Sequence, residues 1–349
     1  MSDASDTSPG PRAVTIDGLV CGDDLGFTLP HEHLTIDTTD VNVVAEPYPP
    51  EAKISIEKLG QLRRWPRSLA ENALLDDDAA VIFDLKKYAA VGGRTLVDVT
   101  PIGMGRDFAR YHAMADASGV NIIASTGYYL SYGHRGRVAG RAAGELAEEF
   151  VTELVEGTAG TRCGMIGEIG MSKEPEPDEW KVLGAALLAS SQTGAPVWIH
   201  VSGLDPVNPV LDFLEKHASR VDNICICHMD YSLEDITVHR RALSMGVNIE
   251  LDLFGYPAWN RSWVFDMPTD TQRARTLIGL AADGYADQIF VSHDVCMKMQ
   301  MSSYGGYGYA HILDAVGETF ETLTGSRDLL MHFGIDNTRR VLCWDTSSS

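Results

Sequence analysis

The chain has 349 residues, of which 44% are hydrophobic and 22% charged, a composition that excludes a disordered or fibrous protein. Its formal net charge of −21 repels phosphate backbones and anionic lipid, so we expect neither nucleic acid nor a membrane as a partner. The six cysteines show no CxxC spacing and no apolar run reaches the roughly 18 residues that span a bilayer, which favours a cytoplasmic protein with reduced thiols.

The first part of the chain predicts a tail, a hairpin and an insertion. Residues 1–13 are small and polar without the apolar core of a signal peptide, so we expect a flexible tail followed by one domain over 14–349. Short apolar pieces broken by glycines predict a β-hairpin that leads into a strand ending at His31 and His33. The proline-rich region 41–78 predicts an irregular insertion rather than a linker between domains.

Apolar, β-prone runs alternate with helical patterns through the rest of the chain. The runs cover 94–100, 120–126, 164–169, 195–201, 223–229, 247–254 and 288–294. The helical stretches lie near 79–91, 106–118, 140–156, 178–193, 207–219, 232–245 and 270–283, with more helix from about 309 to the end. With the strand at His31 there are eight strands, which predicts an α/β fold of the (β/α)8 TIM-barrel class. A doubly wound sheet is the alternative, but no glycine fingerprint for a dinucleotide follows the first strand.

Metal-ligating residue types stand at the C-terminal ends of five predicted strands. Two histidines two apart on a strand project from the same face and can bind one ion, although the pair alone is a weak signal. The full set comprises His31, His33, Glu168, His200, His228 and Asp294. Four imidazoles and two carboxylates are the ligands expected for a pair of zinc-like ions bridged by one carboxylate.

Alternation along the 223–229 run predicts which of its side chains face the site. His228 should share the inward face with Ile224 and Ile226, which leaves Cys225 and Cys227 pointing toward the helices as packed thiols.

Alternation also sorts the polar residues around the other strand ends. His293 should face away from Asp294 and act as a supporting or packing residue. Glu250 and Asp252 share a polar face, and we expect Asp252 and Asp98 to support the ligands through hydrogen bonds.

Five motifs in order resemble the phosphotriesterase family of the amidohydrolase superfamily. They are His-Glu-His at 31–33, Ile-Gly-Glu-Ile-Gly around Glu168, Trp-Ile-His around His200, Ile-Cys-His around His228 and Ser-His-Asp around Asp294, followed by Tyr-Gly-Gly-Tyr-Gly-Tyr at 304–309. The resemblance covers about 18–342 and implies a binuclear hydrolase, with Zn²⁺ as the expected metal and Mn, Fe or Co as alternatives.

The resemblance also implies a role for each ligand. His31, His33 and Asp294 would hold the more buried ion, and His200 and His228 the more exposed one. Many members bridge the ions with a carboxylated lysine, whereas Glu168 here is similar to the subset of phosphotriesterase homology proteins. The motif at 304–309 is similar to the lactonase-like branch.

Candidate substrate-binding residues come from the loops after the strands. Tyr128 and Tyr129 follow the 120–126 run, and Tyr129 falls where lactonase-like relatives place a tyrosine beside the metals; packing is the alternative for both. The loop 255–270 carries Arg261 among aromatic residues and could form a specificity lid or an oligomer contact. Lys298 and Arg273 are candidates to meet an anionic substrate, with solvated surface charge as the alternative. The aromatic loop and the resemblance together suggest a homodimer.

The residues favour hydrolysis of a small-molecule carbonyl compound. Two divalent ions make a bridging hydroxide available near neutral pH, and Asp294 is the best placed group to take its proton and pass it to the leaving group. We expect a lactone or carboxylic ester as substrate. The alternatives are an amide hydrolase using the same site, a phosphotriester or phosphoester hydrolase, and a non-catalytic metal-binding scaffold.

Overall fold

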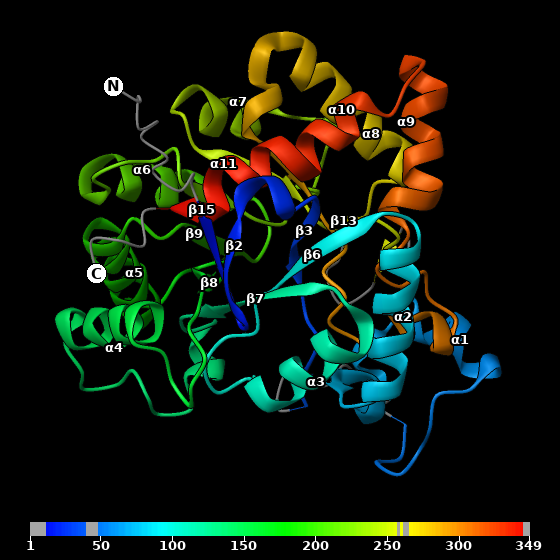
Figure 1. The fold of residues 1–349 in the computed structure, drawn as a ribbon, viewed down its shortest axis with the longest axis horizontal. Coiled ribbons are helices and arrows are strands. Elements are labelled where there is room, and N and C mark those ends of the chain that lie inside the picture. Colours follow the sequence, from blue (N-terminus) through cyan, green and yellow to red (C-terminus); the bar gives the residue numbers. More distant parts are fainter. Residues whose placement is uncertain (1–11, 40–47, 257–258, 261–264, 345–349) are drawn as a thin grey trace, which may run out of the picture.

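Eight parallel strands form a nearly closed barrel, as the alternation of runs and helical patterns predicted (Figure 1). This computed structural model describes residues 12–39, 48–256, 259–260 and 265–344. The strands are β3 (Phe27–Glu32), β6 (Gly93–Asp98), β7 (Asn121–Thr126), β8 (Met165–Met171), β9 (Val197–Val201), β10 (Ile224–Ile226), β11 (Asn248–Leu251) and β14 (Ile289–Val291). They pair in chain order from β3 to β14. The C-terminal ends of consecutive strands therefore meet at one end of the barrel.

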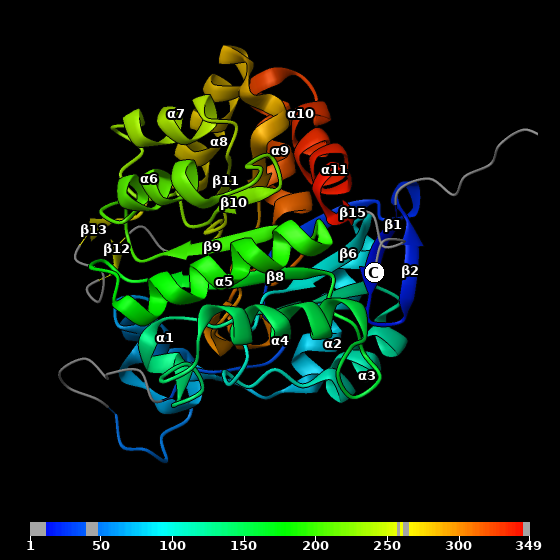
Figure 2. The same ribbon diagram turned by 90° about the vertical axis from the view of Figure 1, so that its left-hand side faces the viewer.

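Helices surround the barrel and cover its outer face (Figures 1 and 2). They are α2 (Asp78–Ala90), α3 (Phe108–Ser118), α4 (Ala143–Val155), α5 (Pro177–Thr193), α6 (Val207–His217), α7 (Thr237–Ser244), α8 (Asp270–Leu280), α9 (Gly317–Thr324), α10 (Asp328–Met331) and α11 (Thr338–Leu342). In α6 the buried residues Val207, Val210, Leu211 and Leu214 follow the three-and-four spacing of one helical face. No helix of the described residues combines the length and apolarity needed to cross a membrane.

Side-chain hydrogen bonds from Glu32 join the first strand of the barrel to the last. The buried Glu32 carboxylate accepts from Ser292 Oγ at 2.9 Å, from the backbone N–H of His293 at 2.9 Å and of Val295 at 2.8 Å, and from His293 Nδ1 at 2.7 Å. In addition, the Asp294 N–H donates to the His31 carbonyl at 3.3 Å. Glu32 thus fixes β3 beside the end of β14.

We expect Glu32→Ala to lower the free energy of unfolding by about 3 kcal/mol, because it leaves several buried donors without an acceptor. Urea denaturation with a chelator present measures this without a contribution from bound metal. Glu148→Ala, at an exposed position of α4, is the matched control and should change stability by less than about 0.5 kcal/mol. Equal stability of the two variants would contradict the role of Glu32.

A three-stranded sheet covers the end of the barrel where its strands begin. The predicted hairpin is formed by β1 (Arg12–Thr15) and β2 (Gly18–Cys21), and β1 also pairs with β15 (Cys343–Trp344). Figure 2 shows this sheet at the opposite end from α1 (Ile56–Leu62). Two predictions are corrected: the strand begins at Arg12, inside the expected tail of 1–13, and the chain does not stay helical to its end. Both segments are ordered by pairing with each other, which local sequence patterns do not show.

The insertion before α2 packs against the loop that follows β14. It contains α1, the 3-10 helices η2 (Pro66–Ser68) and η3 (Ala70–Ala73), and β5 (Leu74–Leu75), which pairs with β4 (Ile36–Asp37) just before the insertion. It is therefore less irregular than the prolines suggested. A second short pair, β12 (Trp259–Asn260) and β13 (Phe265–Asp266), lies at the same end of the molecule as α1 (Figure 2).

Candidate metal centre

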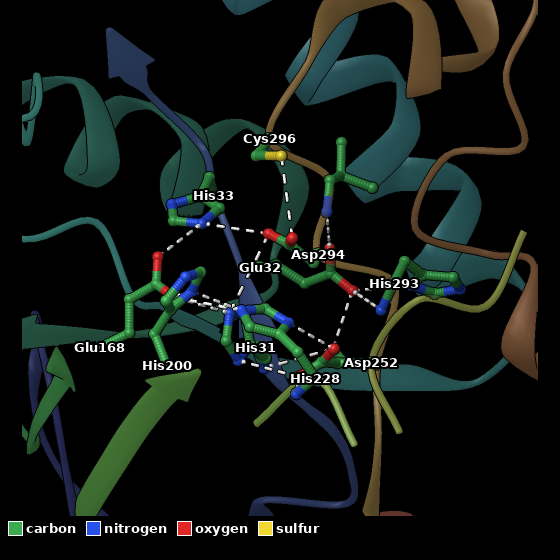
Figure 3. Close-up of polar contacts among 12 residues, drawn as sticks. His31, Glu32, His33, Glu168, His200, His228, Asp252, His293, Asp294 and Cys296 are labelled. Carbon is green, nitrogen blue, oxygen red and sulfur yellow. Dashed lines mark hydrogen bonds and ion pairs between the residues drawn. The ribbon is translucent and has the colours of Figure 1, made fainter. Parts of the chain in front are cut away.

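Six side chains predicted from the sequence converge at the C-terminal end of the barrel (Figure 3), and the Glu168 carboxylate lies close to all four histidines. Its Oε2 atom is 2.9 Å from His200 Nδ1, 3.5 Å from His31 Nε2 and 3.5 Å from His228 Nε2, and its Oε1 atom is 3.6 Å from His33 Nε2. One carboxylate therefore faces all four imidazoles. This is the place that a bridging ligand between two ions would occupy.

Asp294 completes one side of the group. Its Oδ1 atom is 3.3 Å from His33 Nε2 and 4.0 Å from His31 Nε2. Ligand atoms of two triads lie within 4.8 Å of one another: His31, His33 and Asp294, and His31, Glu168 and His228. The structure thus brings all six predicted ligands together, while their roles as ligands stay a prediction.

Unusual backbone conformations turn three of these residues into the site. His228 and Asp294 have φ values of 56° and 49°, in the left-handed region that non-glycine residues seldom adopt. Each comes just after its strand has ended, at Ile226 and Val291 respectively. Before Glu168, a Cβ on Gly167 would stand 2.6 Å from the carbonyl oxygen of Trp198, so only glycine fits against β9.

Hydrogen bonds on the outer nitrogens orient three imidazoles. His33 Nδ1 donates to Thr100 Oγ1 at 2.8 Å, because that hydroxyl donates its own proton to the Thr35 carbonyl. His228 Nδ1 donates to Asp252 Oδ1 at 2.7 Å. His31 Nδ1 lies 3.2 Å from Glu250 Oε2. In each case the Nε2 atom is turned toward Glu168, and the neutral ring would offer its lone pair there to a metal.

Glu168 and His200 have the protonation states that metal ligands require. Burial raises the pKa of Glu168, but His200, His228 and His31 outweigh burial and hold that pKa well below its usual range. Burial and the neighbouring His228 lower the pKa of His200. At His31, His33 and His228 burial lowers the pKa, but the neighbouring carboxylates outweigh burial and raise the pKa, so a metal would displace protons from these rings. The buried Nε2 atom of His31 has no hydrogen-bond partner among the described residues. An anionic carboxylate, a neutral imidazole and an unpartnered nitrogen at one centre fit divalent metal ions.

The supporting carboxylates lie where the alternation predicted. Asp252 accepts from the backbone N–H of His228 at 2.9 Å as well as from its ring. Asp98 accepts from the N–H groups of Leu34 at 2.6 Å and Thr100 at 2.9 Å, and so holds the segment after His33. His293 faces Glu32 instead of Asp294, as expected (Figure 3).

The prediction for the cysteines of β10 is wrong. Cys225 and Cys227 face the barrel interior with Trp198, whereas Ile224 and Ile226 pack in the cluster that includes the residues of the surrounding helices. The Cys227 thiol lies within 4.8 Å of ligand atoms on His31, Glu250 and Asp252. Strict alternation would place His228 on the face opposite to Cys225 and Cys227. Its left-handed backbone conformation breaks the alternation, so its side chain enters the site although the cysteines also face inward. All six cysteines are nevertheless free thiols, as expected.

The two tyrosines after β7 point in opposite directions. The Tyr129 hydroxyl is 3.2 Å from His200 Nε2, and the two rings lie 4.6 Å apart between centroids. Tyr128 is buried toward α4, where its hydroxyl donates to Glu149 at 3.0 Å and its ring contacts Phe150. Tyr129 therefore remains a substrate-binding candidate. Tyr128 does not, because its side chain packs against α4.

The cations predicted to meet substrate have other partners. Lys298 Nζ is buried and 2.5 Å from Asp76 Oδ1, and Arg273 is fully buried with its guanidinium on Asp230. Both predictions for them, substrate contact and solvated surface charge, are therefore wrong. Their ion pairs join distant segments, which the sequence does not reveal. Arg261 lies outside the described residues.

Three residues near the site were not candidates from sequence. Cys296 Sγ is 3.8 Å from Asp294 Oδ2, and the Tyr132 ring lies 5.8 Å from that of Tyr129 between centroids (Figure 3 shows Cys296). Arg67, from the insertion, acts electrostatically on Tyr129, Tyr132 and Cys296. Tyr132 could have been found by its closeness to Tyr129 in the sequence, whereas Arg67 lies in a segment with no regular pattern.

A (β/α)8 barrel with histidines and carboxylates gathered at its strand ends defines a hydrolase of the phosphotriesterase-like superfamily. The chain belongs to the phosphotriesterase family, whose model matches residues 11–342. Proteins of this family are binuclear metal enzymes, and the cluster around Glu168 provides possible ligands.

Similar proteins cover nearly the whole chain. An N-acetyltaurine hydrolase from Salmo salar is 35% identical over 314 residues, which are 86% of this chain and 89% of that protein. The crystal structure of a resiniferatoxin-binding protein from Rhodobacter sphaeroides is 36% identical with a TM-score of 0.92, over 97% of this chain and 96% of the other. A mutant phosphotriesterase-like lactonase from Deinococcus radiodurans is 26% identical with a TM-score of 0.74, over 95% and 99% of the two chains.

Proposed function

We propose that this protein is a metal-dependent amide hydrolase that cleaves the acyl C–N bond of a small N-acylated amine. The convergence of four imidazoles and Asp294 on Glu168 is the observation that carries the proposal. The choice of an amide follows the N-acetyltaurine hydrolases, which are 34–35% identical to this chain in fish, an amphibian and mammals.

The ligand set accounts for the metal requirement. Mixed imidazole and carboxylate donors suit Zn²⁺, which we propose as the metal, and also accept Mn, Fe or Co. We assign His31, His33 and Asp294 to one ion, His200 and His228 to the other, and Glu168 to both. When bound, two such ions supply hydroxide near neutral pH and polarise the acyl carbonyl.

The protein residues supply proton transfer and orientation. An amine leaves poorly as an anion, so its nitrogen must be protonated as the C–N bond breaks. Asp294 faces the centre of the cluster and accepts a proton at a carboxylate oxygen, then delivers it to the leaving nitrogen. Burial raises the pKa of Tyr129 well above its usual value, so its hydroxyl keeps its proton. Tyr129 therefore donates a hydrogen bond to the bound acyl group beside His200.

Hydrolysis of a lactone or carboxylic ester is the second candidate. The same carbonyl attack serves an ester, and a lactonase from Deinococcus radiodurans is 26% identical over 95% of this chain. The two activities differ in leaving group, because an alkoxide needs less help from a proton donor than an amine does.

A substrate panel with metal-free and metal-loaded protein tests the proposal. We expect the zinc-loaded protein to release acetate from N-acetyltaurine, a chelator to abolish this activity, and added Zn²⁺ to restore it. Matched lactone, ester and phosphoester substrates should be turned over at least about tenfold less efficiently in kcat/KM. Preference for the lactone or ester would instead favour the second candidate. Inactivity of the loaded protein on every member of the panel would contradict a hydrolase role.

A further inference from the structure

Arg67 carries a buried donor atom, Nη1, that has no hydrogen-bond acceptor within the described part of the chain. Among the residues that the structure describes, no aspartate or glutamate forms an ion pair with this side chain. The chain has 49 acidic and 28 basic residues, so acidic partners are abundant. A buried guanidinium donor without a partner destabilises the folded state unless a ligand provides the acceptor.

Three other cations with little exposed side-chain surface form ion pairs with carboxylates. Arg106 makes two hydrogen bonds of 2.8 Å to the Glu153 carboxylate. Arg273 and Lys298 form ion pairs with aspartates. Arg106, Arg273 and Lys298 thus each have a carboxylate partner, whereas no carboxylate of the described residues forms an ion pair with Arg67.

The turn that carries Arg67 is fixed against the loop after Asp294. Asn72 Nδ2 donates to the Pro66 carbonyl at 2.8 Å, and Asn72 Oδ1 accepts from the Met299 N–H at 2.8 Å. Leu62 and Leu69 add apolar contacts in a cluster that includes Met299. Asn72 therefore joins the turn beside Arg67 to the segment that follows the metal centre, and the arginine has a defined position.

The positive charge of Arg67 acts on three side chains at or beside the metal centre. Burial raises the pKa of Tyr129, of Tyr132 to about 12, and of Cys296, and the positive charge of Arg67 opposes this rise at all three. Tyr129 contacts His200, and Cys296 lies beside Asp294. None of these three side chains is a carboxylate that could form an ion pair with Arg67. Tyr132 is 41% exposed, so this group opens to solvent.

We propose that Arg67 binds an anionic group, a sulfonate or a carboxylate, on the amine portion of the substrate while the acyl group lies at the metal centre. This inference rests on the proposed amide hydrolysis and specifies its substrate class. The planar guanidinium matches two oxygens of either anion, and a local cation offsets the repulsion from a chain of charge −21. A neutral amide would leave Arg67 unpartnered.

Steady-state kinetics of Arg67→Gln with charged and neutral amides tests the inference. The substrates are N-acetyltaurine, N-acetyl-β-alanine and the neutral sulfone N-[2-(methylsulfonyl)ethyl]acetamide, which matches the sulfonate in shape. We expect KM to rise about 10- to 100-fold for at least one anionic amide, with kcat changed only a few-fold and the neutral amide unaffected. The anion with the larger rise identifies the preferred group. Unchanged KM for both anions, or an equal rise for the sulfone, would overturn the proposal.

Two controls separate this result from misfolding and from a general charge effect. Arg63→Gln removes the same charge four positions away, just after α1, and should leave the KM values within about twofold. A binding measurement that needs no turnover uses ethanesulfonate and propionate with the zinc-loaded protein in a calorimeter. Wild type should bind at least one of them about tenfold more tightly than Arg67→Gln does. Equal binding would overturn the role of Arg67, whether or not the protein hydrolyses amides.

Discussion

Asp294→Asn is expected to lose most of its turnover while keeping its fold and at least one metal ion. Asparagine preserves the size of the side chain and one oxygen that can face His33, where Asp294 Oδ1 now lies at 3.3 Å. It cannot accept a proton and pass it to the leaving nitrogen. Loss of a positioned acid–base group lowers kcat by about 10²- to 10⁴-fold. Measurements of kcat and of metal content on the same sample test both parts.

The matched control for this variant is Asp205→Asn, which removes the same charge at an exposed position paired with Lys173. It should retain wild-type kcat within about twofold, because exposed ion pairs contribute little. A kcat for Asp294→Asn within tenfold of wild type, with both ions bound, would refute the proton-transfer role of this aspartate.

The barrel could be predicted because its strands are buried on both faces and so appear as continuous apolar runs. β9 (Val197–Val201) is fully buried and falls within the run predicted at 195–201. The order of the strands then followed from a simple rule, that successive βα units lie side by side. Metal-ligand residue types at the ends of these runs were visible for the same reason, since strand ends share one rim of the barrel.

Side-chain direction could be predicted only where the strand continued regularly. Glu250 and Asp252 followed the alternation of β11, and both reach His31. His228 did not, because β10 ends at Ile226 and the left-handed conformation at His228 reverses the direction of its side chain. A non-glycine residue in this conformation has no signature in a pattern of apolar and polar residues. The errors for Cys225 and Cys227 have this single cause.

Residues that act through distant contacts could not be found from the sequence. Asn72 places the turn that carries Arg67 through a hydrogen bond to Met299, 227 positions away. Lys298 forms its ion pair with Asp76, on a segment equally remote in the chain. Neither contact follows from local propensity, so the sequence showed which cations exist but not which of them remains available to a substrate.

Glu168→Ala is expected to reduce metal content from two ions toward one and to abolish most activity. The Glu168 carboxylate lies within 3.6 Å of nitrogen atoms on all four histidines, so its removal deprives both proposed ion positions of an anionic ligand. The His31, His33 and Asp294 triad remains and should retain one ion. Inductively coupled plasma mass spectrometry of the dialysed protein measures the ratio of metal to chain.

Glu168→Gln separates the lost charge from the lost volume. Glutamine fills the same space beside His200 but offers one neutral oxygen, and divalent ions prefer an anionic donor at a position that bridges them. We therefore expect Glu168→Gln to bind fewer than two ions, as Glu168→Ala does. If the alanine variant alone loses metal, Glu168 acts by filling the space between the histidines. If both variants retain two ions, the bridge between them lies elsewhere, and the remaining ligands must be reassigned.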